Sequence, residues 1–141
     1  MFENPAKAEI DALLLRIRTI AILGVSETPG KPSHHVAAEL QKFGYKIVPV
    51  NPTAKEILGE KAYPDLESAL KGAGPVDLVD VFRRPEHVAA IVEDCIRLKV
   101  PALWLQEGVV DEAAAAKARA AGIFTVMDRC VFKVRSAIRP G

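Results

Sequence analysis

The chain has 141 residues, and its 19 basic and 18 acidic side chains leave a formal net charge of +1 at pH 7. General nucleic-acid binding or attachment to a membrane surface calls for a clustered basic excess, which this balance disfavours. Half of the residues are hydrophobic, as in soluble α/β proteins, and two cysteines are too few for a disulfide-rich secreted scaffold. We therefore expect one cytoplasmic domain over residues 1–141, with no membrane-spanning segment and no nucleic-acid partner.

A helix is predicted first, over residues 5–18, because apolar side chains from Ile10 to Ile17 recur on one stripe. The core of the domain is expected over residues 19–130. The tail, residues 131–141, is mixed basic and apolar. This tail could form a terminal turn or pack on an unidentified protein partner, and an exposed sheet edge could support a homodimer.

Residues 20–52 predict a strand, a turn, a helix and a second strand. Residues 20–23 and 45–50 are apolar runs typical of buried parallel strands. Between them, apolar residues recur at three-to-four spacing, with Ser33 expected as the helix N-cap and Gly44 as the helix stop. This order is a βαβ unit, whose crossover is expected to be right-handed.

The turn between the first strand and this helix carries groups that suit a phosphate. Gly24 and Gly30 let the backbone approach a ligand, and N–H groups at a helix N-terminus attract an anion. Lys31 and the hydroxyls of Ser26 and Ser33 could add contacts. The glycine spacing matches neither the dinucleotide fingerprint nor a Walker A loop, so the signal is weak. A turn that binds nothing stays open as the alternative.

The end of the second strand bears on the choice of nucleotide. Dinucleotide-binding folds usually place an acidic residue there to bind the ribose. Here Val50 is followed by Asn51 and Pro52, and no carboxylate appears before Glu56. NAD is therefore disfavoured, and the prolines indicate a stiff wall suited to a flat ring.

The rest of the chain predicts strands over residues 76–82, 100–105 and 123–127, with a short edge strand near residues 62–63. We expect a Rossmann-like, doubly wound α/β domain of about five mainly parallel strands, in the order 3-2-1-4-5, with helices on both faces. The switch point is expected between the strands that end at Leu23 and Phe82, where ligands of such sheets bind.

Polar groups follow these strands at the ligand-binding edge. Arg83 and Arg84 could hold a phosphate bidentately, although a solvated basic turn is an equal alternative. Gln106 and Gly108 are expected to face the same crevice. Trp104 is expected in the core.

Two aspartates, Asp77 and Asp80, interrupt the strand over residues 76–82. At least one is expected at a strand end or in a hydrogen bond, because a buried unpaired carboxylate is costly. Neither has a carboxylate or histidine placed beside it by the sequence, and His87 has no visible nucleophile partner. No catalytic or metal-ligating constellation is predicted.

Short segments distributed from residue 20 to residue 130 carry a family resemblance. The chain resembles the small bacterial and archaeal CoA-binding proteins, which are similar to the N-terminal CoA-binding domain of the succinate–CoA ligase alpha subunit. The segments are Leu23-Gly24-Val25-Ser26, Gly44-Tyr45, Val48-Pro49-Val50-Asn51-Pro52, Asp80-Val81-Phe82-Arg83-Arg84, Trp104-Leu105-Gln106 and Val126-Met127-Asp128-Arg129-Cys130.

This resemblance implies that coenzyme A or an acyl-CoA binds at the strand ends. The diphosphate would be held by backbone and hydroxyl groups, and the adenosine would be lined by the end of the second strand. Phosphate charge would meet basic side chains, and the opposite wall and the thiol end would come from the later loops. The expected contacts are Gly24, Val25, Ser26 and Ser33 for the diphosphate and Val50, Asn51 and Pro52 for the adenosine. Lys31 and Lys55 are expected to meet phosphate charge, Phe82, Arg83 and Arg84 to form the opposite wall, and Gln106 and Gly108 to lie near the thiol end.

The resembled ligase uses a phosphorylated histidine from a second domain and a nucleotide-grasping beta subunit. Neither is expected within these residues, so we expect a binding module with no catalysis of its own. Two alternatives stay open: a subunit of an acyl-CoA ligase or transferase completed by a separate chain, and an NAD(H)-binding regulatory domain.

Overall fold

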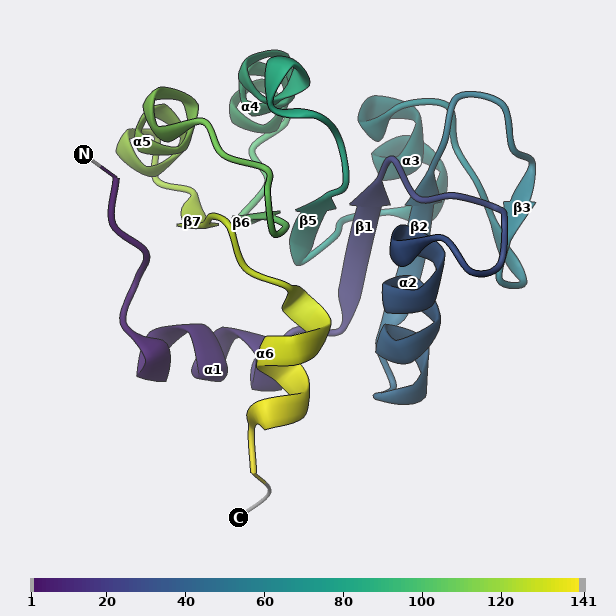
Figure 1. Ribbon diagram of the computed structural model, residues 1–141. Helices are drawn as coiled ribbons and strands as arrows, with labels where there is room; N and C mark the ends of the chain where they lie inside the picture. The colour runs from purple at the N-terminus through teal and green to yellow at the C-terminus, as the bar shows by residue number, and fades with distance from the viewer. Residues whose placement is uncertain (1, 140–141) are drawn as a thin grey trace.

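The computed structural model describes residues 2–139, which form a parallel sheet between two layers of helices (Figure 1). The expected Rossmann-like α/β fold is confirmed. The sheet contains, from one edge to the other, β2 (Lys46–Val50), β1 (Thr19–Leu23), β5 (Leu78–Val81), β6 (Ala102–Leu105) and β7 (Phe124–Val126), all parallel.

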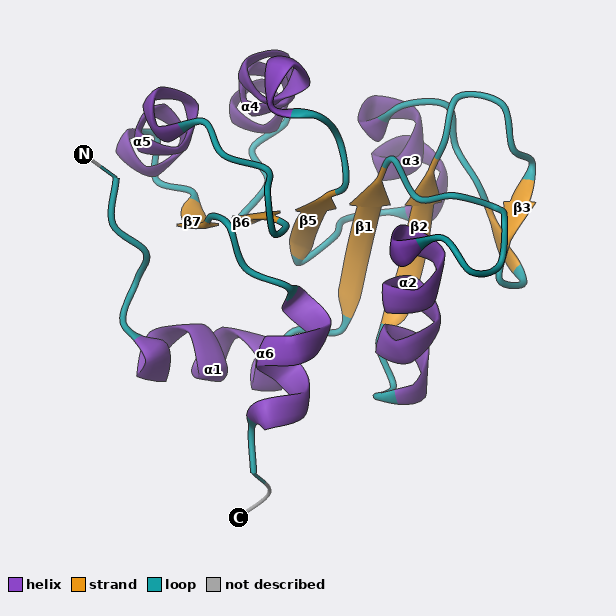
Figure 2. Ribbon diagram, in the orientation of Figure 1, coloured by secondary structure: helices purple, strands orange, loops and turns teal. Residues whose placement is uncertain are grey.

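Each face of the sheet is covered by three α-helices (Figure 2). One layer contains α3 (Leu66–Ala73), α4 (Val88–Arg97) and α5 (Glu112–Ala120), and the other contains α1 (Lys7–Arg16), α2 (Pro32–Lys42) and α6 (Val131–Ala137). A 3-10 turn, η1 (Pro85–His87), precedes α4, and a short hairpin of β3 (Glu56–Ile57) and β4 (Glu60–Lys61) follows β2.

The order of the strands agrees with the expected 3-2-1-4-5, in which the short edge strand near residues 62–63 is the third. In the structure this third strand is reduced to an isolated parallel bridge between Val50 and Tyr63 beside β2. β2, β1, β5 and β6 lie in the expected order, and β7 adds a further strand beyond β6. β5 is fully buried in the centre of the sheet, beside β1. The switch point between β1 and β5 lies where it was expected.

The strands are mainly apolar, as in sheets whose two faces are both covered. Ala21 faces the layer of α3, α4 and α5, and Ile22 faces the layer of α1, α2 and α6. Trp104 is fully buried on β6, as expected, and its indole Nε1–H donates to the carbonyl of Arg129 at 2.9 Å. This bond ties the loop after β7 to the sheet.

The two aspartates of the β5 segment have different surroundings. Asp77 precedes the strand, and its Oδ2 accepts the backbone N–H groups of Arg18 and Thr19 at 2.9 and 3.0 Å. Asp80 lies in the middle of β5, with Ile22 and Trp104 as its neighbours in register, and is 0% exposed. Neither carboxylate oxygen of Asp80 has a hydrogen-bond partner among the described residues. Burial therefore raises the pKa of Asp80 well above its usual range.

The first helix begins later than expected, at Lys7 in place of residue 5. Asn4 lies outside the helix, where its side chain forms two hydrogen bonds with the backbone of Met127. Its Nδ2 donates to the Met127 carbonyl at 2.9 Å, and its Oδ1 accepts the Met127 N–H at 2.7 Å. The N-terminal segment thus covers the β7 edge before the chain enters α1 (Figure 1).

The tail contains a helix, α6, that packs against α1 and α2. Its Arg135 donates from Nε to the hydroxyl of Tyr45 at 3.0 Å, and that hydroxyl donates to the carbonyl of Leu14. Burial raises the pKa of Tyr45, and Arg135 opposes this shift. This chain of contacts holds the end of α6 against α1 and the amino end of β2.

Candidate functional site

Two large clefts and one smaller hollow open at the edge where the parallel strands end. The main cleft, about 750 Å³ in volume, extends from the head of α2 to α6. The side cleft, about 550 Å³, extends toward the loop after β2. They meet at five residues that line both, which are Gly24, Ser26, Phe82, Arg83 and Arg84.

Gly24 allows the loops after β1 and β5 to approach each other closely at this junction. Its φ of +82° is a left-handed conformation, and a Cβ on this residue would lie 2.2 Å from the carbonyl oxygen of Phe82. Its N–H donates to the carbonyl of Val50 at 3.0 Å, and the N–H of Phe82 donates to that of Leu23 at 2.8 Å. Glycine is therefore required here by the packing of the strand ends themselves.

Ser33 does not cap α2 as expected. Lys31 occupies the N-cap position with no side-chain cap bond, and Pro32 is the first helical residue. The buried Ser33 instead accepts the N–H of Ser26 on its Oγ at 2.9 Å, and the Oγ of Ser26 accepts the N–H of Thr28 at 3.0 Å. The two serines thus order the loop and leave the first-turn N–H groups of α2 without intrahelical acceptors.

Asn51, expected to line an adenosine, holds the neighbouring loops together. Its Nδ2 donates to the carbonyl of Val25 at 2.9 Å, while its Oδ1 accepts the N–H groups of Thr53 and Ala54 at 2.9 Å each. Asn51 and Val25 also line the side cleft, together with the exposed Pro52.

Two expected site residues lie outside both clefts. Val50 is 6% exposed, packs into the layer of α3, α4 and α5, and lines a smaller hollow of about 160 Å³ together with Gly24, Pro52 and Arg83. Lys55 lies in the loop before β3, where its carbonyl accepts the N–H of Ala62. Neither residue lines the main or the side cleft.

Cationic side chains surround the junction. Arg83 and Arg84 follow β5 and are exposed, and Lys31 reaches the main cleft from the head of α2. The only ion pair of Arg84 within residues 2–139 is a loose one, 3.8 Å from its Nη1 to Glu86. His87, which sequence reasoning set aside, also lines the side cleft. Its position three residues after Arg84, at the end of η1, is the signal that could have found it.

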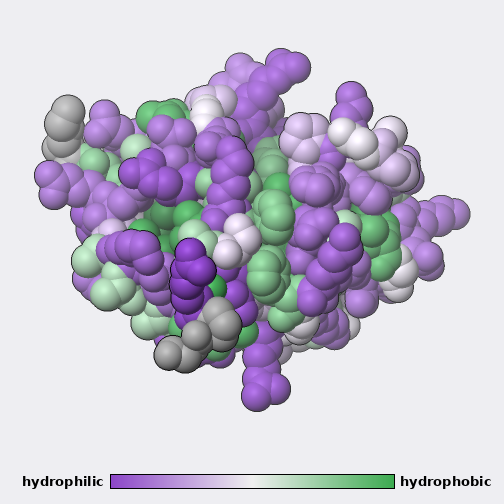
Figure 3. Space-filling view, turned by 60° about the horizontal axis from the view of Figure 1, so that its bottom comes forward, coloured by the Kyte–Doolittle hydropathy of each residue, from purple (hydrophilic) through white to green (hydrophobic). Residues whose placement is uncertain are grey.

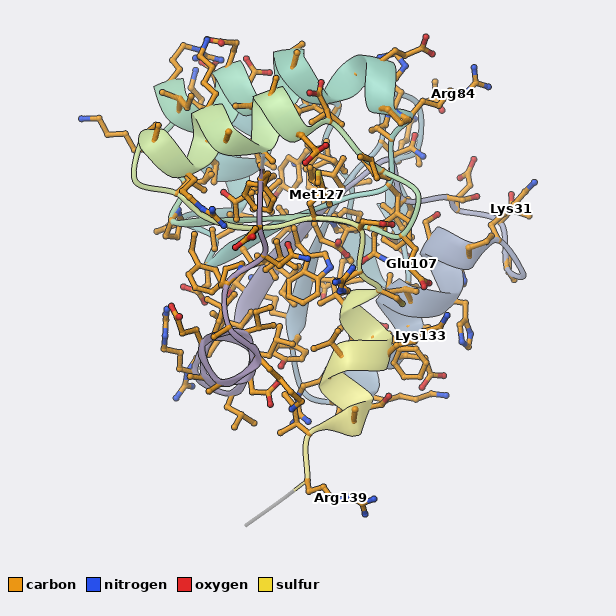
Figure 4. The ribbon with its side chains drawn as sticks, turned by 60° about the vertical axis from the view of Figure 1, so that its left-hand side comes forward. Lys31, Arg84, Glu107, Met127, Lys133 and Arg139 are labelled. Atoms are coloured by element: carbon orange, nitrogen blue, oxygen red, sulfur yellow. The ribbon has the colours of Figure 1, made fainter. Side chains whose placement is uncertain are left out.

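The far end of the main cleft is built by the loop after β6 and by α6. The buried Gln106 accepts the N–H of Val131 on its Oε1 at 3.1 Å. The N–H of Gly108 donates to Oδ1 of Asp128 at 2.8 Å. Glu107 pairs with Lys133 on α6, 3.0 Å between Oε1 and Nζ. In Figure 4, Lys31, Arg84, Glu107 and Lys133 lie on one side of the molecule, although they come from four separate segments.

Sequence reasoning missed the contribution of α6 to the main cleft. Phe132 and Lys133 line it, and the buried Cys130 lies at its wall. The ring of Phe132 also packs edge-on against His35 at the start of α2, with 5.7 Å between ring centroids. No motif signalled these residues, because the helix in the tail was not predicted.

The described residues contain no group of three or more histidine, cysteine or acidic side chains placed to hold a metal ion. None of their helices has the length and apolar character needed to cross a bilayer.

Comparison with known proteins agrees with this geometry. Residues 18–135 match the model of the CoA binding domain family. The chain is 40% identical to a Bacillus subtilis (strain 168) protein named "Uncharacterized protein YneT" over 136 residues, which are 96% of this chain and 98% of that protein. The structure of a Thermus thermophilus protein, cell-free ID.343, superimposes with a TM-score of 0.86 at 34% identity and covers 94% of this chain and 98% of its own.

A partial match extends to larger enzymes. The ADP-forming acetate–CoA ligase of Methanocaldococcus jannaschii is 33% identical over 78 residues, which are 55% of this chain and 11% of the ligase. The resemblance to small CoA-binding proteins is thus confirmed over nearly the whole sequence. Because the family model and a relative of matching length cover the same strands and the same strand-end clefts, the chain belongs to the CoA binding domain family.

Proposed function

We propose that this protein binds coenzyme A or an acyl-CoA across the main and side clefts, and that it catalyses no reaction by itself. The observation that carries the proposal is the meeting of the two clefts at Gly24, Ser26 and the paired arginines Arg83 and Arg84. CoA has a flat adenosine, a group of phosphates and a long neutral arm. Two clefts that diverge from a cationic junction match this order of groups.

The adenosine occupies the side cleft in this proposal. The exposed ring of Pro52 supplies a stiff apolar wall there, and the side chain of Asn51 holds the wall against the loop of Val25. Arg84 lines the same cleft and supplies positive charge for a phosphate on the ribose, and the imidazole of His87 beside it can add a hydrogen bond.

The diphosphate lies at the junction. The N–H of Ser26 is bound to Ser33, but the hydroxyl of Ser26 only accepts a hydrogen bond, from Thr28, and can still donate to the diphosphate. The first-turn N–H groups of α2, Lys31 and the guanidinium groups of Arg83 and Arg84 are further donors.

The pantetheine arm lies along the main cleft, between apolar side chains such as Phe82, Val109 and Phe132. Its thiol end reaches Gln106, Gly108 and Cys130. A volume of about 750 Å³ is ample for this arm, since small-molecule sites span roughly 300–1,000 Å³.

Calorimetric titration with CoA, acetyl-CoA, NAD and ATP in parallel tests the proposal. We expect CoA and acetyl-CoA to bind at micromolar or lower concentration and NAD to bind much more weakly. Tighter binding of NAD or ATP would overturn the choice of ligand. Ser26→Trp fills the junction and should abolish CoA binding, whereas Ser136→Trp on the exposed side of α6 should leave it intact.

A second candidate function is that of a subunit in an acyl-CoA ligase, and the partial match to acetate–CoA ligases favours it. In that case the clefts hold CoA while a separate chain supplies the reacting groups. Affinity purification from the native host should then recover a second subunit together with acyl-CoA turnover. Recovery of the protein alone, with full CoA binding, supports the binding module.

A further inference from the structure

A groove of about 460 Å³ lies between α1 and α6, outside both clefts. We call it the α1/α6 groove. Ile10 on α1 and Val134 on α6 line it, with Pro5 near its edge. Figure 3 turns the side of the molecule with α1 and α6 forward and shows hydrophobic side chains in hollows between hydrophilic ones. The groove thus combines apolar and charged side chains, and Oδ1 of its one carboxylate, Asp11, is buried without a hydrogen-bond partner among the described residues.

The rim of the groove carries more positive than negative charge. Lys7, Arg129 and Lys133 line it, against the single carboxylate of Asp11. Lys7 pairs with Asp11 at 2.5 Å, and Lys133 pairs with Glu107 at 3.0 Å. The exposed Arg129 has no acidic partner within residues 2–139. Its Nη1 donates to the backbone carbonyl of Asp128, at 2.7 Å.

The groove adjoins the end of the main cleft. Lys133 lines both, and Arg129 immediately precedes Cys130, which lines the main cleft. The first turn of α6 is held at this boundary by the bond from the Val131 N–H to Gln106. A group attached to a thiol at this end of the main cleft therefore has the groove as the next hollow beyond Lys133.

We propose that the α1/α6 groove receives the acyl part of an acyl-CoA whose acyl chain ends in a carboxylate. This inference rests on the proposed function, because it requires the thiol end of CoA to lie at Gln106 and Cys130. The methylene groups of the acyl chain pack on Ile10 and Val134, and the terminal carboxylate pairs with the guanidinium of Arg129. A guanidinium without an acidic partner can bind a carboxylate bidentately without first breaking an ion pair.

Glutaryl-CoA and pentanoyl-CoA test this proposal, because their acyl chains have the same number of carbons and only the first ends in a carboxylate. Titrations of the wild-type protein with both thioesters and with free CoA should show glutaryl-CoA binding about tenfold more tightly than pentanoyl-CoA, as for one charge-assisted contact. Free CoA serves as the reference for the clefts themselves.

Two substitutions should change the preference in opposite directions. Arg129→Gln should reduce the advantage of glutaryl-CoA to within about twofold and leave CoA and pentanoyl-CoA unchanged, since only one charged contact is removed. Asp11→Asn removes the rim carboxylate and should strengthen glutaryl-CoA binding. Arg16→Gln removes a cation of α1 that does not line the groove and serves as the matched control.

The outcomes separate this inference from the proposed function. If CoA binds but glutaryl-CoA and pentanoyl-CoA bind equally well to the wild type, the role of the groove is refuted and the CoA site stands. If neither CoA nor its thioesters bind, both proposals fall. A preference for glutaryl-CoA that survives Arg129→Gln, with the variant folded by circular dichroism, also refutes the assignment of the carboxylate to this groove.

Discussion

A Cβ on Gly24 would lie 2.2 Å from the carbonyl oxygen of Phe82, so the loops after β1 and β5 can meet only because residue 24 lacks a side chain. This contact closes the floor of the junction between the main and side clefts. The same glycine has a left-handed φ, which other residues adopt only with strain. One residue therefore sets both the backbone geometry of the loops and the shape of the junction between the clefts.

Gly24→Ala should strongly destabilise the fold. The clash is with backbone, which cannot rotate away, and the φ of +82° adds strain. We expect a loss of roughly 3–5 kcal/mol in the free energy of unfolding, measured by urea denaturation. Gly30→Ala is the control, since Gly30 has a similar φ of +95° with nothing within 4 Å of its Cβ position. Its loss should be only about 1–2 kcal/mol, and an equal loss for both variants would contradict the role of the Phe82 contact.

Ser33→Ala should leave the N–H of Ser26 without its acceptor. We expect a loss of about 1–3 kcal/mol in the free energy of unfolding, because an ordered donor loses its partner. CoA binding should weaken as well, since this bond orders the loop at the junction. Ser136→Ala removes an exposed hydroxyl that donates to the Lys133 carbonyl. This control should change stability by no more than about 0.5 kcal/mol.

Arg83→Ala should weaken CoA binding by roughly 1.5–3 kcal/mol, the usual range for a hydrogen bond to a charged group. Added salt should reduce the difference between wild type and variant, because Arg83 is exposed and the interaction is screened. Calorimetric titration at two ionic strengths provides the measurement. Arg97→Ala removes a guanidinium paired with Glu67 at the end of α4, away from the clefts, and should leave the affinity unchanged. Unchanged affinity in Arg83→Ala would mean that Arg83 is a solvated turn residue.

Asp80→Asn should alter the dependence of stability on pH. Burial raises the pKa of Asp80 in the folded state, so folding favours the protonated acid. The wild type should therefore lose stability relative to Asp80→Asn as the pH rises from about 4, the unfolded pKa, toward the raised folded value. Urea denaturation of both proteins across pH 4 to 8 tests this, and a constant difference would contradict it.

Asp65 should show the opposite dependence of stability on pH. Its Oδ1 accepts the N–H of Ser68 at the start of α3, and this bond lowers the pKa of Asp65. The stabilisation is present above the unfolded pKa and is lost as the pH falls through the lowered folded value. The difference in the free energy of unfolding between the wild type and Asp65→Asn should therefore disappear only under acidic conditions, in contrast to Asp80→Asn.

Much of the fold could be predicted because its causes are local. Apolar runs such as residues 20–23 and 45–50 can be buried on both faces only in a covered parallel sheet. The position of Gly24 directly after the first strand, and of Arg83 and Arg84 after another, placed them correctly at one edge. The switch point between β1 and β5 followed from the same pattern.

The errors arose where a residue has a choice of partners. Ser33 has the chemistry of an N-cap, yet it accepts a hydrogen bond from Ser26 in the loop. Asn4 suits a helix start, yet it binds Met127 across more than one hundred positions of sequence. Lys55 lies close to the site in sequence but outside both clefts in space.

The sequence by itself determined the class of fold, the order of the strands, the edge at which the clefts open and the glycine and arginines at their junction, because hydrophobic periodicity and strand ends are properties of short segments. Only the tertiary structure decided the role of Asn51 as a loop brace and the place of Phe132 and Lys133 beside the main cleft. It also brought α1 and α6 together around the α1/α6 groove. These features depend on contacts between segments far apart in the chain, and such contacts form and stabilise the fold only when the layers pack together.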